Sequence, residues 1–189
     1  RPPRSTLFPY TTLFRSGRLA PYADRLKGYI EKNGVLLATG NALELFGAYI
    51  QEDRRRIPAL GLFPYHSVRD MEHRHNSMFL GTFGGMKIVG TRSQFSFSYG
   101  ELPHPFLQVT GGIGMNPEAK TEGVHYRNFF ATYLLGPFLV LNPLFTMYLL
   151  EKLGYTGPLA FQREAMEAYT YRLRELERPG VRFQMGEHG

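Results

Sequence analysis

The chain has 189 residues, no cysteine and a formal net charge of +6 at pH 7. Without cysteine it can form neither disulfides nor thiolate metal sites, and it cannot use a cysteine nucleophile. An apolar fraction of 43% suits one globular domain with a sizeable core, and no apolar run is long enough to span a membrane. We expect a cytoplasmic protein without a metal ion or other cofactor.

The N-terminal segment does not resemble part of a fold. Residues 6–16 read TLFPYTTLFRS, which is the translation of a common short-read sequencing adapter. We therefore interpret residues 1–16 as an adapter-derived artefact and expect an N-terminally truncated domain that begins near Gly17. The alternative is a genuine basic, aromatic arm. Excluding the three arginines of this segment lowers the net charge from +6 to +3, which gives no reason to expect a nucleic acid partner.

The first predicted elements are a helix, a strand and a second helix. Residues 21–32 begin at a proline and repeat apolar residues at helical spacing, which predicts an amphipathic helix. Residues 35–39 form a short unbroken apolar run, which is typical of a buried parallel strand. Asn41 can cap a further helix whose apolar face extends to Tyr49. This order predicts a strand, a tight turn and a helix.

The middle of the chain favours short strands. Glycines separate apolar or alternating segments, which predict strands at residues 78–80, 87–89, 95–99 and 106–110. Residues 128–135 are almost entirely apolar and predict a central strand. Pro143 opens a helix that Gly154 ends, and residues 159–177 predict a final amphipathic helix.

Together these elements predict an α/β domain with a mainly parallel sheet and an antiparallel insertion. We expect a single partial domain over residues 17–178. Residues 179–189 are polar and glycine-rich, and we expect a disordered tail there. The densest basic run, Arg54 to Arg56, follows two acidic residues and is interpreted as a solvated helix end or loop.

Three segments carry a family resemblance. They read GVLLATGNALELFG, TEGVHYRNFFATYLLGPFL and TMYLLEKLG, and they lie within about residues 20–155. They resemble class I glutamine amidotransferases of the cobyric acid synthase-like type, in particular the glutaminase subunit of lipid II isoglutaminyl synthase. The resemblance implies a flavodoxin-like fold and a role in bacterial peptidoglycan precursor amidation. It also implies a Mur ligase-like or other amide-forming synthetase subunit as partner.

The residues that carry catalysis in that family are replaced. Its cysteine nucleophile, on a tight turn after a strand, corresponds to Thr39, and the histidine of its Thr-Tyr-Leu-His-Gly-Pro motif corresponds to Leu135. Leucine cannot shuttle protons, so the resemblance implies a pseudoenzyme that is inactive as a glutaminase. Gly40, Asn41 and Gln94 correspond to a vestigial binding pocket, and Gln94 stands where relatives carry histidine.

Two other interpretations use the same turn. A threonine nucleophile at Thr39 would need a base at hydrogen-bond distance, and His125 lies ten residues before Leu135 on the strand leading to it. Alternatively, an enzyme or small-molecule-binding protein of different specificity could reuse the pocket at Thr39, with Asn41 and Glu44 nearby. A polar, closed pocket with a convergent base would favour such an enzyme, whereas an apolar pocket filled by Leu135 would oppose it.

A charged segment contains three histidines. His73 and His75 are spaced so that one face of a strand could present both, and His66 precedes them. Such residues can bind a metal ion. Because no third ligand has an evident spacing, and Arg69 and Arg74 add positive charge, we favour a solvated loop without a metal.

Overall fold

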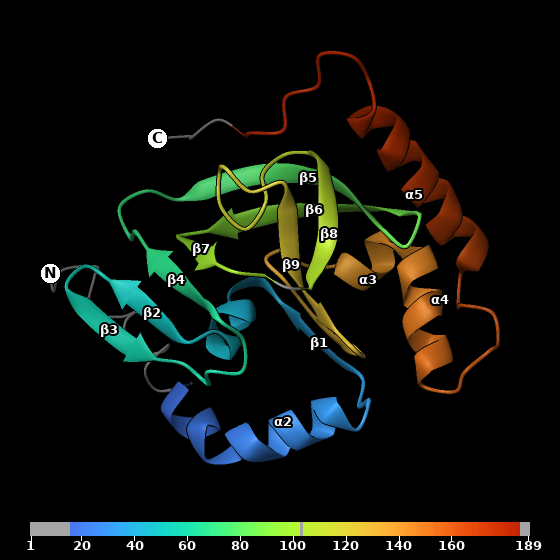
Figure 1. The fold of residues 1–189 in the computed structure, drawn as a ribbon. Coiled ribbons are helices and arrows are strands. Elements are labelled where there is room, and N and C mark those ends of the chain that lie inside the picture. The colour runs from blue at the N-terminus through green and yellow to red at the C-terminus, as the bar shows by residue number, and fades with distance from the viewer. Residues whose placement is uncertain (1–15, 103, 186–189) are drawn as a thin grey trace, which may run out of the picture.

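Two β-sheets with helices packed around them form the protein (Figure 1). The computed structural model describes residues 16–102 and 104–185. Residues 1–15 of the expected adapter-derived segment and residues 186–189 of the expected tail therefore lie outside the described residues. Within the described part of the chain, no helix is long and apolar enough to cross a membrane.

The larger sheet has six strands and the smaller sheet has four. In order, the larger sheet contains β1 (Leu36–Thr39), β10 (Phe129–Thr132), β9 (Thr121–Tyr126), β8 (Pro105–Gly111), β5 (His75–Phe83) and β6 (Met86–Gln94). The smaller sheet contains β3 (Arg55–Pro58), β2 (Tyr49–Glu52), β4 (Tyr65–Arg69) and β7 (Ser96–Gly100). The strands predicted at residues 35–39, 78–80, 87–89, 95–99 and 106–110 are thus confirmed.

Both sheets are mainly antiparallel, which corrects the prediction of a mainly parallel core. Of the eight pairings between described strands, two are parallel, β1 with β10 and β2 with β4. The reason is the short connections: a tight turn can join only antiparallel neighbours, whereas parallel neighbours need a longer crossover. Gly84 and Gly85, with φ of 53° and 82°, make such a turn between β5 and β6. A mixed α/β fold is confirmed, and the flavodoxin-like class stays a prediction.

The helices are short and lie at the faces of the sheets. They are the 3₁₀ helices η2 (Ala20–Tyr22) and η3 (Gly40–Phe46) and the α-helices α2 (Ala23–Glu31), α3 (Phe138–Leu141), α4 (Pro143–Lys152) and α5 (Gln162–Leu176). The helices predicted at residues 21–32, after Pro143 and at residues 159–177 are confirmed within a few residues.

The helix predicted to extend from Asn41 to Tyr49 was wrong beyond its first turns. Only the 3₁₀ helix η3 forms, and Tyr49 already belongs to β2. Gly47 is extended (φ −74°, ψ −173°), and a Cβ there would lie 2.7 Å from the carbonyl oxygen of Tyr65. The chain therefore passes against β4 at this point and pairs with it as a strand.

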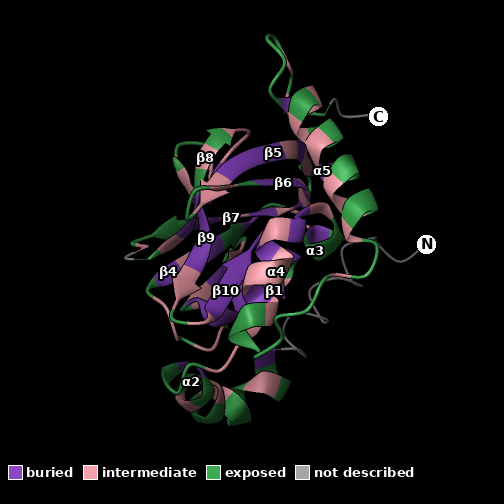
Figure 2. Ribbon diagram, turned by 90° about the vertical axis from the view of Figure 1, so that its right-hand side faces the viewer, coloured by how far each residue is buried: buried purple, intermediate pink, exposed green. Residues whose placement is uncertain are grey.

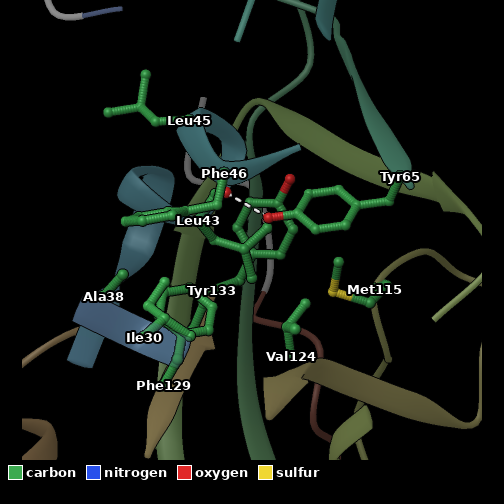
Figure 3. Packing of buried hydrophobic residues seen from close by; sticks show 11 residues of the cluster. Ile30, Ala38, Leu43, Leu45, Phe46, Tyr65, Met115, Val124, Phe129 and Tyr133 are labelled. Atoms are coloured by element: carbon green, nitrogen blue, oxygen red, sulfur yellow. Dashed lines mark hydrogen bonds between the residues drawn. The ribbon is translucent and has the colours of Figure 1, made fainter. Parts of the chain in front are cut away.

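The core fills both faces of the larger sheet, and exposed residues are concentrated on the outer faces of α2 and α5 (Figure 2). One cluster packs η3 and α2 against β1 and β10, and its buried members include Ile30, Phe46 and Phe129. In that cluster the Tyr65 hydroxyl donates to the carbonyl oxygen of Leu43 at 2.6 Å (Figure 3). A second cluster packs α3 and α4 against the opposite face, and a third lies under α5.

Part of the segment expected to be a disordered tail contacts the larger sheet, as far as Met185. The amide of Met78 in β5 donates to the carbonyl oxygen of Phe183 at 2.7 Å. The Phe183 ring packs over Gly111, where any Cβ would collide with it. The Phe183 side chain and the first part of β5, which β8 leaves unpaired, thus provide contacts for this segment that its polar composition did not indicate.

We expect Gly123→Ala to lower the free energy of unfolding by about 2 kcal/mol or more. Gly123 has a φ of 73°, and a Cβ there would collide with the carbonyl oxygen of Ala131. Gly28→Ala is the control, since nothing lies within 4 Å of its Cβ position and helix α2 should tolerate or favour alanine. Urea denaturation measures both. Equal stability of the two variants would contradict the fold at β9.

Candidate functional site

A tight turn at the end of β1 forms the strand-to-helix junction that the sequence predicted. Thr39 is extended (φ −120°, ψ 153°), Gly40 adopts a φ of 61°, and η3 begins there. The side chain of Thr39 is exposed, whereas Gly40 is buried. A side chain at position 40 would be strained by the positive φ, so the turn requires glycine.

Leu135 lies directly against this turn. β1 pairs in parallel with β10, and Thr39 is opposite Thr132. The chain then bends so that the amide of Gly40 donates to the carbonyl oxygen of Leu134 at 3.2 Å. A Cβ at Gly40 would lie 2.7 Å from Cδ2 of Leu135. Thr39 and Leu135, the positions that the resemblance equates with a nucleophile and a base, therefore lie on two segments that contact each other.

The cleft beside Thr39 is apolar. Its volume is about 320 Å³, and its lining consists of Leu37, Thr39, Gly136, Pro137, Phe138, Leu139 and Val140. The Thr39 hydroxyl is the one side-chain polar group in that lining, and none of these side chains can act as a base. Asn41 is exposed outside the cleft lining. Gln94 is buried and accepts a hydrogen bond from Arg92 Nε at 3.1 Å, so it points into the core.

A buried ion-pair cluster lies beyond the turn, on the side of the smaller sheet. Glu44 of η3 accepts a hydrogen bond from Arg69 Nη2 at 2.7 Å, and Glu52 accepts one from Arg69 Nη1 at 3.0 Å. Glu44 is completely buried. Burial raises the pKa of the Glu44 carboxyl, and the Arg69 guanidinium opposes that rise. The positive charge of Arg69 therefore neutralises the carboxylates of Glu44 and Glu52, which belong to η3 and β2.

A buried carboxylate and a buried arginine support the segment that leads to Leu135. The Glu122 carboxylate accepts hydrogen bonds from the Thr132 hydroxyl at 2.7 Å and from the Tyr133 amide at 2.8 Å. The Arg92 guanidinium lies 5.2 Å from the centre of the Tyr133 ring. Burial raises the pKa of Glu122, and the charge of Arg92 opposes that rise. Sequence reasoning assigned no role to Arg92 or to Glu122, although Glu122 lies in one of the segments that carry the family resemblance.

The expected solvated loop around the three histidines is largely a pair of strands, which corrects that interpretation. Residues 65–69 form β4 and His75 begins β5, so only the turn between them is loop. Each histidine has a separate partner: His66 stacks on Tyr49 with 4.8 Å between ring centres, His73 contacts Asp70 at 2.7 Å, and His75 contacts Ser77 at 2.9 Å. Among the described residues, no group of three or more potential ligands could hold a metal ion.

His125 does not lie on one straight strand with Leu135, as the sequence suggested. It belongs to β9, which forms a hairpin with β10 and places His125 opposite Phe130. The imidazole stacks on the Phe130 ring with 4.7 Å between ring centres, and its Nε2 donates to the carbonyl oxygen of Arg127 at 2.9 Å. Burial lowers the pKa of His125. The imidazole of His125 therefore packs against neighbouring aromatic side chains.

Comparison with known proteins identifies relatives over part of the chain. No family model matches the sequence. The GatD subunit of lipid II isoglutaminyl synthase (glutamine-hydrolyzing) from Streptococcus pneumoniae is 32% identical over 127 residues, which cover 63% of this chain and 47% of the relative. The GatD subunit from Staphylococcus aureus is 36% identical over 109 residues, which cover 55% of this chain and 42% of the relative. The chain thus spans less than half the length of either curated relative.

We expect Arg69→Met to destabilise the protein by about 3–5 kcal/mol, because it leaves Glu44 buried without its cation. The double variant Arg69→Met/Glu44→Leu should recover most of that loss. Removing Arg69 also removes the main influence that lowers the Glu44 pKa. With its folded pKa raised further above the unfolded value, the single variant should be most stable at low pH and lose stability as pH rises through the folded pKa.

Chemical denaturation between about pH 4 and pH 8 measures both effects. Single and double variants of equal stability, or a single variant whose stability does not depend on pH, would contradict a buried Glu44–Arg69 pair.

Proposed function

We propose that this chain is part of a glutamine amidotransferase-like subunit that has lost glutaminase chemistry and serves as a scaffold for a Mur ligase-like or other amide-forming synthetase. The setting would be cytoplasmic amidation of a bacterial peptidoglycan precursor. The similarity to the two GatD subunits supports the family and the pathway. The loss of chemistry is supported by the residues of the turn itself.

The observation that carries the proposal is the packing of Leu135 against Gly40, at 2.7 Å from a Cβ built there. Hydrolysis of an amide at this turn needs a nucleophile and a proton shuttle within hydrogen-bond distance. Leu135 occupies the shuttle position with an aliphatic side chain, and Thr39 has no basic group beside it in the cleft lining. A threonine hydroxyl without a base is a poor nucleophile. The turn therefore retains its geometry but does not catalyse the hydrolysis of an amide.

The retained framework supports a scaffolding role. Glu122 and Arg92 hold the strand and loop around Tyr133, and Glu44 and Arg69 join η3 to the smaller sheet. Removing one member of the buried Glu44–Arg69 pair costs several kcal/mol, so this pair keeps η3 in place beside the smaller sheet. A rigid turn without catalysis is suited to binding a partner protein.

We expect purified protein, mixed with its synthetase partner, to release no ammonia from glutamine above the buffer background. Thr39→Ala should leave that background unchanged. The pneumococcal GatD subunit, assayed with its own synthetase, is the positive control for ammonia detection. Ammonia release by this protein that disappears in Thr39→Ala would overturn the proposal and assign the hydroxyl as a nucleophile.

The volume and lining of the cleft favour one alternative, a small-molecule-binding protein that reuses the pocket at Thr39. A cleft of about 320 Å³ is large enough for a small apolar ligand, and its lining offers one hydroxyl to orient it. The absence of a base in this lining argues against an enzyme of different specificity.

A thermal-shift screen of small apolar metabolites tests this alternative. A ligand of the cleft should raise the melting temperature of the wild-type protein and leave that of Leu139→Asp unchanged, because a charge in the lining opposes apolar binding. Tyr171→Asp, on the outer side of α5, is the control. A shift that Leu139→Asp retains would locate the ligand elsewhere.

A further inference from the structure

Three buried polar groups have no hydrogen-bond partner in the described part of the chain: Oε1 of Glu44, the Ser96 hydroxyl and Nη2 of Arg92. Buried polar groups in folded proteins almost always have a partner, either a protein group or an ordered water molecule. Ser96 is opposite Arg69 in the pairing of β4 with β7, and Arg69 binds Glu44, so a small rotation can join Ser96 to Glu44 directly. Nη2 of Arg92 is the group that still needs an acceptor.

The other nitrogens of the Arg92 side chain are held by neutral groups. Nε donates to the side-chain oxygen of Gln94 at 3.1 Å, and Nη1 donates to the carbonyl oxygens of Ile113 and Gly114. None of these acceptors carries a formal charge. Because a buried charge without a charged or well-bonded partner is costly, the remaining Nη2 group is expected to find one.

Glu122 is the opposite charge close to Arg92. Burial lowers the pKa of Arg92 and raises that of Glu122, and each charge opposes the shift of the other. The amide of Met115, directly after the loop that Arg92 binds, donates to the carbonyl oxygen of Thr121 at 2.9 Å. Both side chains also reach Tyr133: the guanidinium lies 5.2 Å from its ring centre, and the carboxylate accepts its amide. The two charges therefore converge from two sides on one buried place.

We propose that one buried water molecule bridges these two charges, accepting a hydrogen bond from Nη2 of Arg92 and donating one to the carboxylate of Glu122. Each carboxylate oxygen accepts one hydrogen bond from the protein, from Thr132 or from Tyr133, and has room for a second. Water is held in protein interiors where at least two polar groups face each other across more than a direct hydrogen bond. Arg92 and Glu122 are 1% and 0% exposed, so the bridge does not depend on which segments cover the surface.

The water links two parts of the chain beside the candidate site. On one side Arg92 holds the loop at residues 113–114, and on the other Glu122 holds the amide of Tyr133, two positions before Leu135. Water-mediated contacts are nearly as favourable in enthalpy as direct hydrogen bonds, so the link helps to fix this segment. The proposal concerns how the segment is held, and it does not depend on the proposed function.

A crystal structure of the full chain, at a resolution that shows ordered water, tests the proposal. We expect a water molecule within about 2.7–3.2 Å of both Nη2 of Arg92 and one carboxylate oxygen of Glu122. A direct contact between Nη2 and that carboxylate, or the lack of an ordered water between them, would overturn it. This measurement needs no variant, so it decides the question even if substitutions at Arg92 prevent folding.

Oxygen-17 relaxation dispersion in solution is an independent test, because it counts water molecules that stay inside the protein. Arg92→Met removes the donor, and we expect it to hold one long-lived water fewer than the wild type. Arg163→Met is the matched control, since the Arg163 side chain is 81% exposed and its loss should leave the count unchanged. Equal counts in the wild type and a folded Arg92→Met variant would contradict the bridge.

Discussion

The parallel pairing of β1 with β10 determines the geometry of everything around the candidate site. Because the two strands run in the same direction and Thr39 is level with Thr132, their carboxyl ends meet at one place. The turn at Gly40 and the loop through Leu135 therefore contact each other, and the apolar cleft lies beside them, lined by Leu37, Thr39 and residues 136–140. An antiparallel pairing of the same two strands would separate these positions by the length of a strand.

The elements nearest the site could be predicted from local pattern. The unbroken apolar run at residues 35–39 indicates a buried strand, and Gly40 indicates the turn that follows it. The prediction that Thr39 and Leu135 belong to one site came from the family resemblance, because no sequence periodicity relates residues so far apart in the chain. The prediction of a mainly parallel sheet was wrong because the turn at Gly84 and Gly85 makes β5 and β6 antiparallel neighbours. Both glycines are visible in the sequence.

The buried charges could not be predicted by the same means. Arg69 follows Tyr65 and Ser67 on the inward face of β4, but an arginine at that place in an alternating strand is usually exposed. Its burial depends on Glu44 and Glu52, which belong to η3 and β2. The burial of Glu122 likewise depends on hydrogen bonds from Thr132 and Tyr133, which follow it on the next strand and loop. Such pairs arise from tertiary contacts that local patterns do not encode.

The hydrogen bonds of Glu122 fix the backbone of the site independently of the side chain at position 135. Its carboxylate holds the amide of Tyr133 and the hydroxyl of Thr132, and that hydroxyl in turn accepts a hydrogen bond from the amide of Leu134 at 3.1 Å. The backbone that presents residue 135 is thus fixed from β9, without help from the side chain at that position. A change of side chain at position 135 therefore leaves these hydrogen bonds, and the backbone arrangement that depends on them, intact.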